Sequence, residues 1–228
     1  MTPVLAKSSP GPSQMRIVVF FAVEAEARPF RRTAAGFDSI ETVVSGMGEK
    51  RAQAAVDAGL RESPKPELIL TCGFAGGLNP GIGHGEVVFD ADPGFPLTDR
   101  LRQAGAIPGT FQHSKIVLAT TAAKQRAHTE TRADAVDMES RIIRDAARRA
   151  GVPSATVRVI SDASGEDLPL DFGRFLTPDD RLSYPRLLWH VARSPSIISK
   201  LMQFQRSLGI AAGRLAAVLG STLVSPHS

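Results

Sequence analysis

Several carboxylic acids in this sequence stand beside apolar runs, where an unpaired charge is costly. Asp137 and Glu139 lie in the stretch AVDMES, Asp162 ends the stretch VRVISD, and Glu24 and Glu26 follow the apolar run MRIVVFF. A carboxylate in apolar surroundings persists only if it is paired, hydrogen-bonded or used in chemistry. The sequence therefore predicts a site in which acids donate protons, accept protons or accept hydrogen bonds.

Apolar segments of strand length alternate with helical segments and would position these acids. We expect buried strands at 15–23, 41–48, 67–78, 86–91, 115–121 and 155–161, and helices at 24–36, 49–63 and 137–151. Strands that alternate with helices predict an α/β fold with a largely parallel sheet. Ligands of such sheets bind at the carboxyl ends of the strands, where the acids and the glycine-rich stretches SGMG and GFAGGL fall.

Each of these residues also has a purely structural interpretation. Glu139 would suit the first turn of a helix because a negative charge is favourable near the helix N-terminus. Asp162 could cap a turn after its strand, and Glu24 and Glu26 could simply begin a helix. The glycines could mark turns. Spacing alone leaves both interpretations open.

Composition is that of one ordinary globular domain. The 228 residues are 43% hydrophobic and 22% charged, which argues against disorder. Cys72 is the single cysteine, so no internal disulfide can form and a reducing compartment, the cytoplasm, is expected. Residues 1–14 are rich in proline and serine and are interpreted as a flexible leader rather than a secretion signal. No apolar run is long enough to span a membrane.

The C-terminal segment 181–228 carries six basic residues and no Asp or Glu. Removing these six charges from the total of +4 leaves −2 for residues 1–180, which argues against a nucleic-acid partner. We expect a short helix at 184–194 and a long amphipathic helix at 194–220, whose apolar stripe comprises Ile197, Leu201, Phe204, Leu208, Ala211, Leu215 and Leu219. That helix could pack on the sheet, or its basic face could contact the inner face of an anionic membrane as a peripheral anchor.

Five motifs, over about residues 15–164, resemble the nucleoside phosphorylase and nucleosidase superfamily. In chain order they are AVEAEA, SGMG, GFAGGL, AVDMES and VRVISD. The branch most similar contains the methylthioadenosine and S-adenosylhomocysteine nucleosidases. The resemblance implies a three-layer α/β/α sandwich with a central mixed, largely parallel sheet, plus C-terminal helices, over an α/β domain at 15–180 and a helical extension at 181–228. It also implies a homo-oligomer, a dimer, that cleaves the bond between a purine and ribose.

The same resemblance implies roles for individual side chains. Asp162 would protonate the purine N7, Glu26 would orient or deprotonate the nucleophile, and Arg158 would help to hold it. Glu139 would bind the ribose hydroxyls and stabilise the cationic sugar of the transition state. The remaining substrate-binding residues implied are Met138, Met47, Phe74, Ala75 and Ser161.

Departures from the family pattern bear on the nucleophile and the substrate. The turn AVEAEA lacks the phosphate-binding GDP of bacterial phosphorylases, which favours water, while Arg28 and Arg51 keep phosphate open as a co-substrate. No metal or other cofactor is expected. Phe74 replaces a small hydroxyl residue, and Ala122 and Ala123 stand where an aromatic residue would stack on the base, so Phe74 or Phe172 would take over stacking. The segment between EVVFDA and KIVLATT is short, which would open the side facing the ribose 5′ carbon.

An open 5′ side and a basic amphipathic tail are similar to the hopanoid-associated phosphorylases. That resemblance implies adenosylhopane, a lipid-linked adenine nucleoside, as substrate in hopanoid biosynthesis. One alternative is a methylthioadenosine and S-adenosylhomocysteine nucleosidase. An alternative of another class is a catalytically inactive, membrane-surface lipid-binding protein, against which the retention of all three acids argues.

Overall fold

The computed structural model describes residues 15–170 and 196–224. The predicted helix at 184–194 and Phe172 lie outside these ranges. Within them, an eight-stranded mixed sheet forms the centre of the molecule, in the order β2-β1-β3-β8-β4-β5, with β7 pairing with β3 and β6. The strands are β1 (Ile17–Phe21), β2 (Ile40–Val44), β3 (Leu68–Gly77), β4 (Val87–Ala91), β5 (Ile107–Pro108), β6 (Phe111–His113), β7 (Ala135–Asp137) and β8 (Ser154–Asp162).

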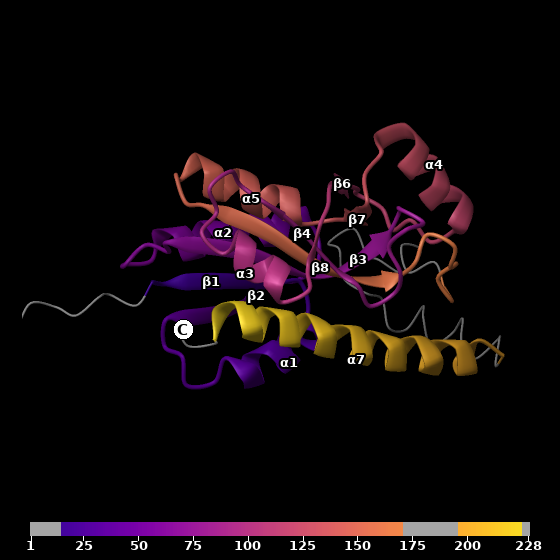
Figure 1. The fold of residues 1–228 in the computed structure, drawn as a ribbon, viewed down its shortest axis with the longest axis horizontal. Helices are drawn as coiled ribbons and strands as arrows, with labels where there is room; N and C mark the ends of the chain where they lie inside the picture. The colour runs from indigo at the N-terminus through magenta and orange to yellow at the C-terminus, as the bar shows by residue number, and fades with distance from the viewer. Residues whose placement is uncertain (1–14, 171–195, 225–228) are drawn as a thin grey trace, which may run out of the picture.

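Helices cover both faces of this sheet. They are α1 (Glu24–Thr33), α2 (Glu49–Arg61), α3 (Thr98–Gln103), α4 (Thr121–Thr131), α5 (Ser140–Arg149) and α7 (Ser196–Leu223). Helices α2 and α5 lie on one face and α1 and α7 on the other, as Figure 1 shows. The predicted three-layer α/β/α architecture with a largely parallel sheet is therefore confirmed.

Alternate side chains of β1 pack into the two hydrophobic cores on opposite faces of the sheet. Val18 and Phe20 point into the core under α2 and α5, whereas Val19 and Phe21 point into the core under α1 and α7. A strand buried on both faces reads as a continuous apolar run, which is why the pattern at 15–23 predicted it correctly. Strands β2, β1, β3 and β8 run parallel, so their carboxyl ends meet at one edge.

One predicted strand is wrong. The run at 115–121 forms no strand: residues 114–120 are a loop, and α4 begins at Thr121. The Ser114 hydroxyl bonds to the backbone of Ile116 on both sides, which closes a turn instead of a ladder. Ile116 is 68% exposed, so the apolar side chains of this loop are not in the core.

Helix α7 is amphipathic, as predicted, and its second half packs on the sheet. Ala211, Leu215 and Leu219 are fully buried in the core shared with β1, β3 and α1. Figure 1 shows α7 running alongside α1 beneath the sheet. The packing interpretation therefore holds for this half of the helix. The first half continues past the core, and Leu201, Phe204 and Leu208 are only partly buried.

Candidate active site

A cavity of about 330 Å³ lies at the carboxyl ends of β1, β3 and β8. Its wall contains every site residue predicted from the sequence except Arg158: Glu26, Met47, Phe74, Ala75, Met138, Glu139, Ser161 and Asp162. These residues come from segments that are far apart along the chain. The parallel strands β1, β2 and β8 end at one edge of the sheet and bring Glu26, Met47 and Asp162 there. Strand β7, which pairs antiparallel with the end of β3, brings Met138 and Glu139 to the same place.

Glu26, in the first turn of α1, is held by backbone groups. Its Oε2 accepts hydrogen bonds from the N–H groups of Ala22 at 3.0 Å and Val23 at 3.1 Å, and Oε1 accepts one from Phe74 at 2.8 Å. Burial raises the pKa of Glu26, although the Arg158 charge and these bonds oppose the shift. A carboxylate oxygen accepts two hydrogen bonds, so Oε1 keeps one position free for a water molecule.

Arg158 lies beneath the cavity rather than in its wall. It is 1% exposed, and its Nη1 donates to the carbonyl oxygen of Cys72 at 3.0 Å. Gly73 adjoins it with a φ of +144°, and a Cβ at this position would lie 2.6 Å from both Arg158 Nη1 and Glu26 Oε1. Only glycine fits there, because the strand must pass directly over the two side chains.

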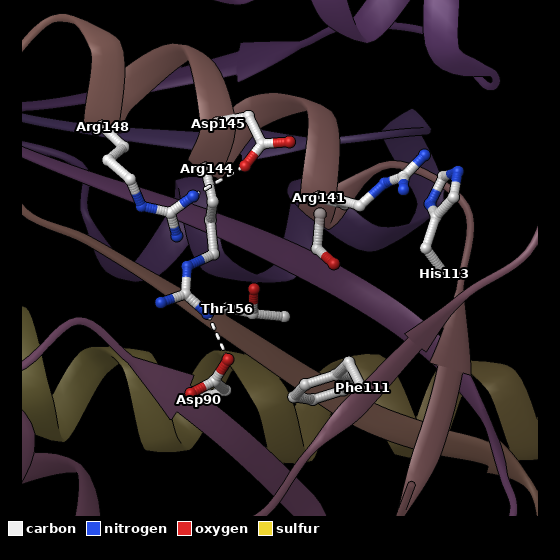
Figure 2. Close-up of a pocket in the computed structure, with 9 residues that line it drawn as sticks. Asp90, Phe111, His113, Arg141, Arg144, Asp145, Arg148 and Thr156 are labelled. Carbon is white, nitrogen blue, oxygen red and sulfur yellow. Dashed lines mark hydrogen bonds and ion pairs between the residues drawn. The ribbon is translucent and has the colours of Figure 1, made fainter. Parts of the chain in front are cut away.

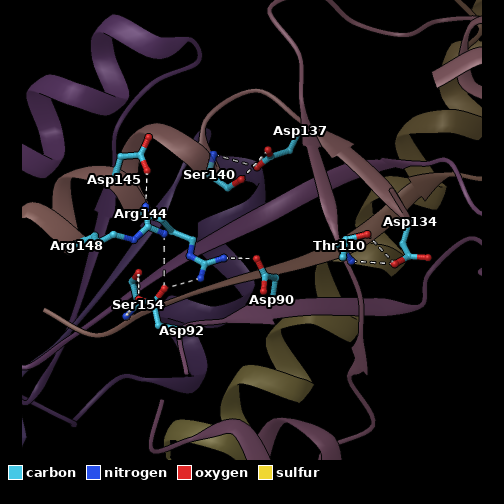
Figure 3. Close-up of polar contacts among 10 residues, drawn as sticks. All are labelled: Asp90, Asp92, Thr110, Asp134, Asp137, Ser140, Arg144, Asp145, Arg148 and Ser154. Carbon is cyan, nitrogen blue, oxygen red and sulfur yellow. Dashed lines mark hydrogen bonds and ion pairs between the residues drawn. The ribbon is translucent and has the colours of Figure 1, made fainter. Parts of the chain in front are cut away.

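Asp137, at the end of β7, has a structural explanation. Its Oδ2 pairs with Arg158 Nη2 at 2.7 Å and also accepts the Ser140 backbone N–H at 3.0 Å. Its Oδ1 accepts the Ser140 hydroxyl at 2.7 Å, and Figure 3 shows the contacts between Asp137 and Ser140 at the start of α5. Asp137 therefore compensates the buried guanidinium and orders the turn that presents Met138 and Glu139.

Glu139 is less fully paired than Asp137. Its Oε1 accepts the Gly48 N–H at 3.0 Å, and its Oε2 lies 4.0 Å from Arg158 Nη2. Burial raises the pKa of Glu139, and the neighbouring Asp137 adds to the increase, against the opposing influence of Arg158 and the Gly48 bond. The free capacity of this buried carboxylate faces the cavity, where it can accept hydrogen bonds from hydroxyl groups.

Asp162, the last residue of β8, can carry a proton. Ser161 Oγ lies 2.5 Å from Asp162 Oδ1 and 3.2 Å from the carbonyl oxygen of Ala75. A hydroxyl has one proton, so Ser161 can give it to Ala75 and accept the proton of a neutral Asp162. Burial raises the pKa of Asp162 despite the opposing charge and hydrogen bond of Lys124. A neutral carboxyl group at this point can act as a general acid.

Lys124, on α4, was not predicted from the sequence. It is fully buried, and its Nζ lies 2.5 Å from Asp162 Oδ2. The run TTAAK predicts only a helix start, and a lysine there is ordinarily exposed. No spacing along the chain relates Lys124 to Asp162, because the contact depends on how α4 packs against the end of β8.

A set of apolar side chains in the wall was also not predicted. It comes from the loop before α4, from the segment after β8 and from α7, and comprises Ile116, Val117, Leu118, Leu168, Phe204 and Leu208. Phe74, one of the two aromatic residues proposed for stacking, lies in the wall, whereas Ala122 and Ala123 do not line it. The wall of the cavity therefore combines carboxylates with apolar side chains.

A second cavity of about 330 Å³, here called the outer cavity, lies between α5 and the strands β4, β6 and β8 (Figure 2). Arg144 bridges Asp90 and Asp92, with Nη2 2.7 Å from Asp92 Oδ1, and Arg148 pairs with Asp145 at 2.8 Å. Figure 3 shows that Asp92 also accepts hydrogen bonds from Ser154. These cations and carboxylates largely neutralise each other, and Arg141 and His113 complete the polar lining.

Comparisons with known proteins agree with the motifs. The family model described as the Phosphorylase superfamily matches residues 101–178. Futalosine hydrolase of Helicobacter pylori has a similar structure, with a TM-score of 0.66 and 15% identity over 92% of this chain and 97% of that one. An S-adenosylhomocysteine nucleosidase from Streptococcus pyogenes, in complex with 5-methylthiotubericidin, gives 0.68 and 19% over 94% and 98%. Among curated proteins, no match was found.

A further similar structure is the methylthioadenosine and S-adenosylhomocysteine nucleosidase of Colwellia psychrerythraea in complex with adenine, with a TM-score of 0.67 and 17% identity over 92% of this chain and 95% of that one. At these identities the structural likeness concerns the fold. The family match, over residues 101–178, agrees with the sequence-based resemblance to the nucleoside phosphorylase and nucleosidase superfamily.

Two features are not found in the part of the chain that the structure describes. Across residues 15–170 and 196–224, no helix has the length and apolar character needed to cross a membrane. Over the same ranges, no group of three or more His, Cys, Asp or Glu side chains is placed to hold a metal ion.

Proposed function

We propose that this protein cleaves the N-glycosidic bond of a purine nucleoside whose ribose carries an apolar substituent at the 5′ carbon. The observation that supports this proposal most is the meeting of Glu26, Glu139 and Asp162 in one cavity whose wall also contains many apolar side chains. The base is adenine, as the resemblance to adenine nucleosidases implies. Adenosylhopane, with its triterpenoid 5′ group, is the candidate substrate.

Each acid has a distinct task in this reaction. Asp162 transfers its proton to the purine N7 as the bond from ribose C1′ to N9 breaks, and the electron pair of that bond leaves with the base. The ribosyl ring becomes positively charged, and the carboxylate of Glu139 stabilises it through the ribose hydroxyls. Ribose packs against Met138, and the 5′ carbon lies near Met47.

Water is the nucleophile in this proposal. Glu26 has one free acceptor position on Oε1, which orients a water molecule and removes its proton as it attacks C1′. Among the described residues, no Lys or Arg lines this cavity, so a phosphate dianion would lack a counter-charge in its wall. Arg158 acts from below by its charge, while Arg28 and Arg51 do not line the cavity.

The apolar wall supports a large 5′ substituent. Ile116, Phe204 and Leu208 lie in the wall of the cavity that also holds Met47. Ile116 is 68% exposed, so the apolar surface continues to the outside of the molecule. A hydrocarbon group bound there would remove this surface from water, at about 25 cal/mol for each Å² buried.

Base release tests the proposal. Purified protein is incubated with adenosylhopane, methylthioadenosine and S-adenosylhomocysteine, each with and without phosphate, and adenine is quantified by chromatography. We expect the highest kcat/KM for the hydrophobic substrate and no dependence on phosphate. Release that requires phosphate would show that phosphate, and not water, is the nucleophile. No release from any substrate would favour an inactive lipid-binding protein.

A second candidate substrate class is supported by the structural relatives. Several of them are methylthioadenosine and S-adenosylhomocysteine nucleosidases with TM-scores of 0.61 to 0.67. If this chain shares their substrate, methylthioadenosine will be cleaved with a higher kcat/KM than the hydrophobic nucleoside in the same assay. The ratio of the two values distinguishes the candidates.

We also propose that the first half of α7 contacts an anionic membrane. Ile198, Met202 and Ile210 are 44%, 52% and 63% exposed, and Arg206 stands on the same ridge at a spacing of four residues. Helix α7 contains no acidic residue. Apolar side chains interspersed with cations fit an anionic lipid surface.

Vesicle sedimentation tests this contact. The triple variant Ile198→Ser, Met202→Ser, Ile210→Ser should lose binding to vesicles that contain phosphatidylglycerol. Phe37→Ser, which changes a comparably exposed apolar residue elsewhere, is the matched control. Equal sedimentation of wild type with anionic and neutral vesicles would contradict the proposal. Deletion of residues 181–228 is unsuitable, because it would remove the core residues Ala211, Leu215 and Leu219.

A further inference from the structure

The ammonium group of Lys124 is saturated by protein acceptors. Its Nζ contacts Asp162 Oδ2 at 2.5 Å and donates to the carbonyl oxygens of Ala163 at 2.9 Å and Glu166 at 2.6 Å. A lysine ammonium has three N–H donors. All three are used within the protein, so Lys124 has no donor left for a substrate.

All three acceptors belong to one short segment. Asp162, Ala163 and Glu166 form the end of β8 and the turn that follows it, and the Glu166 side chain closes this turn by accepting the Ala163 N–H at 3.0 Å. Lys124 therefore fixes both the carboxyl group of Asp162 and the backbone that carries it. Burial of a full charge costs free energy, so holding a turn does not by itself explain a buried lysine.

Neighbouring contacts extend this connection to the start of α4. Asp167 Oδ1 accepts the backbone N–H of Thr121 at 2.6 Å and its hydroxyl at 2.8 Å, and the Leu168 N–H donates to the carbonyl oxygen of Ala119 at 2.9 Å. The first turn of α4 and residues 162–168 thus form one connected unit. Lys124 is the member of this unit that touches the acid.

We propose that Lys124 is a positioning residue for the reaction. It holds Asp162 in the orientation needed for proton transfer to the leaving base, and it stabilises the carboxylate that remains after the transfer. The inference rests on the proposed function, in which Asp162 is the acid.

The proton balance explains the second task. Before bond cleavage, Asp162 is neutral; its proton moves to the purine N7, and Asp162 becomes a carboxylate next to the Lys124 ammonium. Lys124 keeps its three protons throughout. Asp162 then regains a proton from water once the base has left. A fixed cation beside the acid lowers the energy of the state that follows proton transfer without reorganisation.

Other charges also face Asp162 and are retained when Lys124 is changed. Glu166 lies in the following turn and raises the pKa of Asp162, while Glu139 and Glu26 stand across the cavity. Arg158 is paired with Asp137 below the floor. His84, Asp167 and Lys200 line an adjoining cavity that Asp162 also borders. Removal of Lys124 takes away the cation in contact with Asp162, so the pKa of Asp162 will rise further above the ordinary value.

The test compares Lys124→Met with Arg126→Met, a matched change of an exposed cation on the same helix. We expect Lys124→Met to lower kcat about 10²-fold with a smaller change in KM, as a misdirected catalytic group does. General-acid catalysis requires protonated Asp162, so kcat/KM falls as the pH rises through its pKa. In Lys124→Met this descending limb should move to higher pH. An unmoved limb with reduced kcat would indicate a merely structural lysine.

A double-mutant cycle with Asp162→Asn gives a second readout. If Lys124 acts through Asp162, the change Lys124→Met costs little more once Asp162 is lost. Multiplicative losses would overturn the proposal. If Lys124→Met does not fold, Lys124→Gln, which retains an amide donor without the charge, takes its place.

The titration of Asp162, followed by nuclear magnetic resonance of isotope-labelled aspartate, needs no turnover. A higher Asp162 pKa in the Lys124 variant supports the pairing even if wild type releases no base. The lack of base release would contradict the proposed function but not the pairing. An unchanged Asp162 titration would refute the role of Lys124.

Discussion

The outer cavity and the cavity at the carboxyl ends of the strands have the same volume, about 330 Å³, but they differ in how their charged side chains are paired. In the outer cavity Arg144 and Arg148 are paired with Asp90, Asp92 and Asp145. In the cavity at the carboxyl ends of the strands, no cation of the described chain lines the wall. Lys124 and Arg158 lie next to its acids but do not line the cavity.

The pKa directions follow this difference. Burial alone would raise the pKa of Asp92 in the network beside the outer cavity, but hydrogen bonds from Ser154 and Arg144 outweigh burial and lower it. Burial raises the pKa values of Glu26, Glu139 and Asp162 because their compensation is incomplete. The number of charges therefore does not distinguish the proposed active site. Incomplete pairing of buried charges does.

The largest effect is expected for Asp162→Asn. An amide cannot donate an acidic proton to the leaving base, so kcat should fall about 10² to 10⁴-fold. Steady-state adenine release and circular dichroism measure activity and fold. The matched control is Asp92→Asn in the ion-pair network, which should keep wild-type kcat. Similar losses in both variants would mean that the two regions do not differ in function.

Glu139→Gln should lower kcat about 10² to 10³-fold, because the neutral amide no longer stabilises positive charge on ribose. The pH dependence of the stability of this variant should also differ from that of wild type. The raised pKa of Glu139 contributes stability below the ordinary carboxyl pKa that is lost as the pH rises through the folded-state value. Glutamine does not ionise, so the melting temperature of the variant should decline less than that of wild type between acid and neutral pH. A steeper decline would contradict the assignment.

Gly73→Ala should reduce kcat about 10²-fold, because the new Cβ would lie 2.6 Å from Glu26 Oε1 and displace that carboxylate. The matched control is Gly213→Ala on α7, where a Cβ meets no atom within 4 Å. That control should keep wild-type activity and gain slightly in stability, since alanine favours a helix over glycine. Equal activity of the two variants would show that Glu26 does not need its observed position.

The smallest expected effect is the stability loss of Asp92→Asn, about 1 to 3 kcal/mol at neutral pH, from hydrogen bonds and ion pairs that the amide cannot replace. A lowered pKa contributes stability above the ordinary carboxyl pKa, and it is lost as the pH falls through the folded-state value. The difference in unfolding free energy between wild type and variant should therefore shrink in acid. Urea unfolding at several pH values measures it, and a difference that grows in acid would oppose the pairing scheme.

The sequence predicts the acidic half of the site well and the apolar half poorly. Glu26, Glu139 and Asp162 follow strands or begin helices, and these local signals fix the edge of the sheet at which they appear. Lys124 escapes prediction because nothing local distinguishes a buried lysine on α4 from an exposed one.

The loop at 114–120 escapes prediction for a related reason. An apolar run of strand length at Ile116 can equally line a cavity, and only the absence of a pairing partner in the folded chain decides between the two. Helix α7 shows the same ambiguity in the tail. Its apolar stripe fits both packing and membrane contact, and burial of Leu215 and Leu219 assigns only its second half to the core.

The central claim is most directly tested by single-turnover cleavage of a 5′-alkylated adenosine by wild type and Asp162→Asn across a range of pH. We expect adenine and the free ribosyl product from wild type, with a rate that falls at high pH as Asp162 loses its proton, and almost none from the variant. Wild-type rates in Asp162→Asn, or a rate that stays constant as the pH rises, would contradict it.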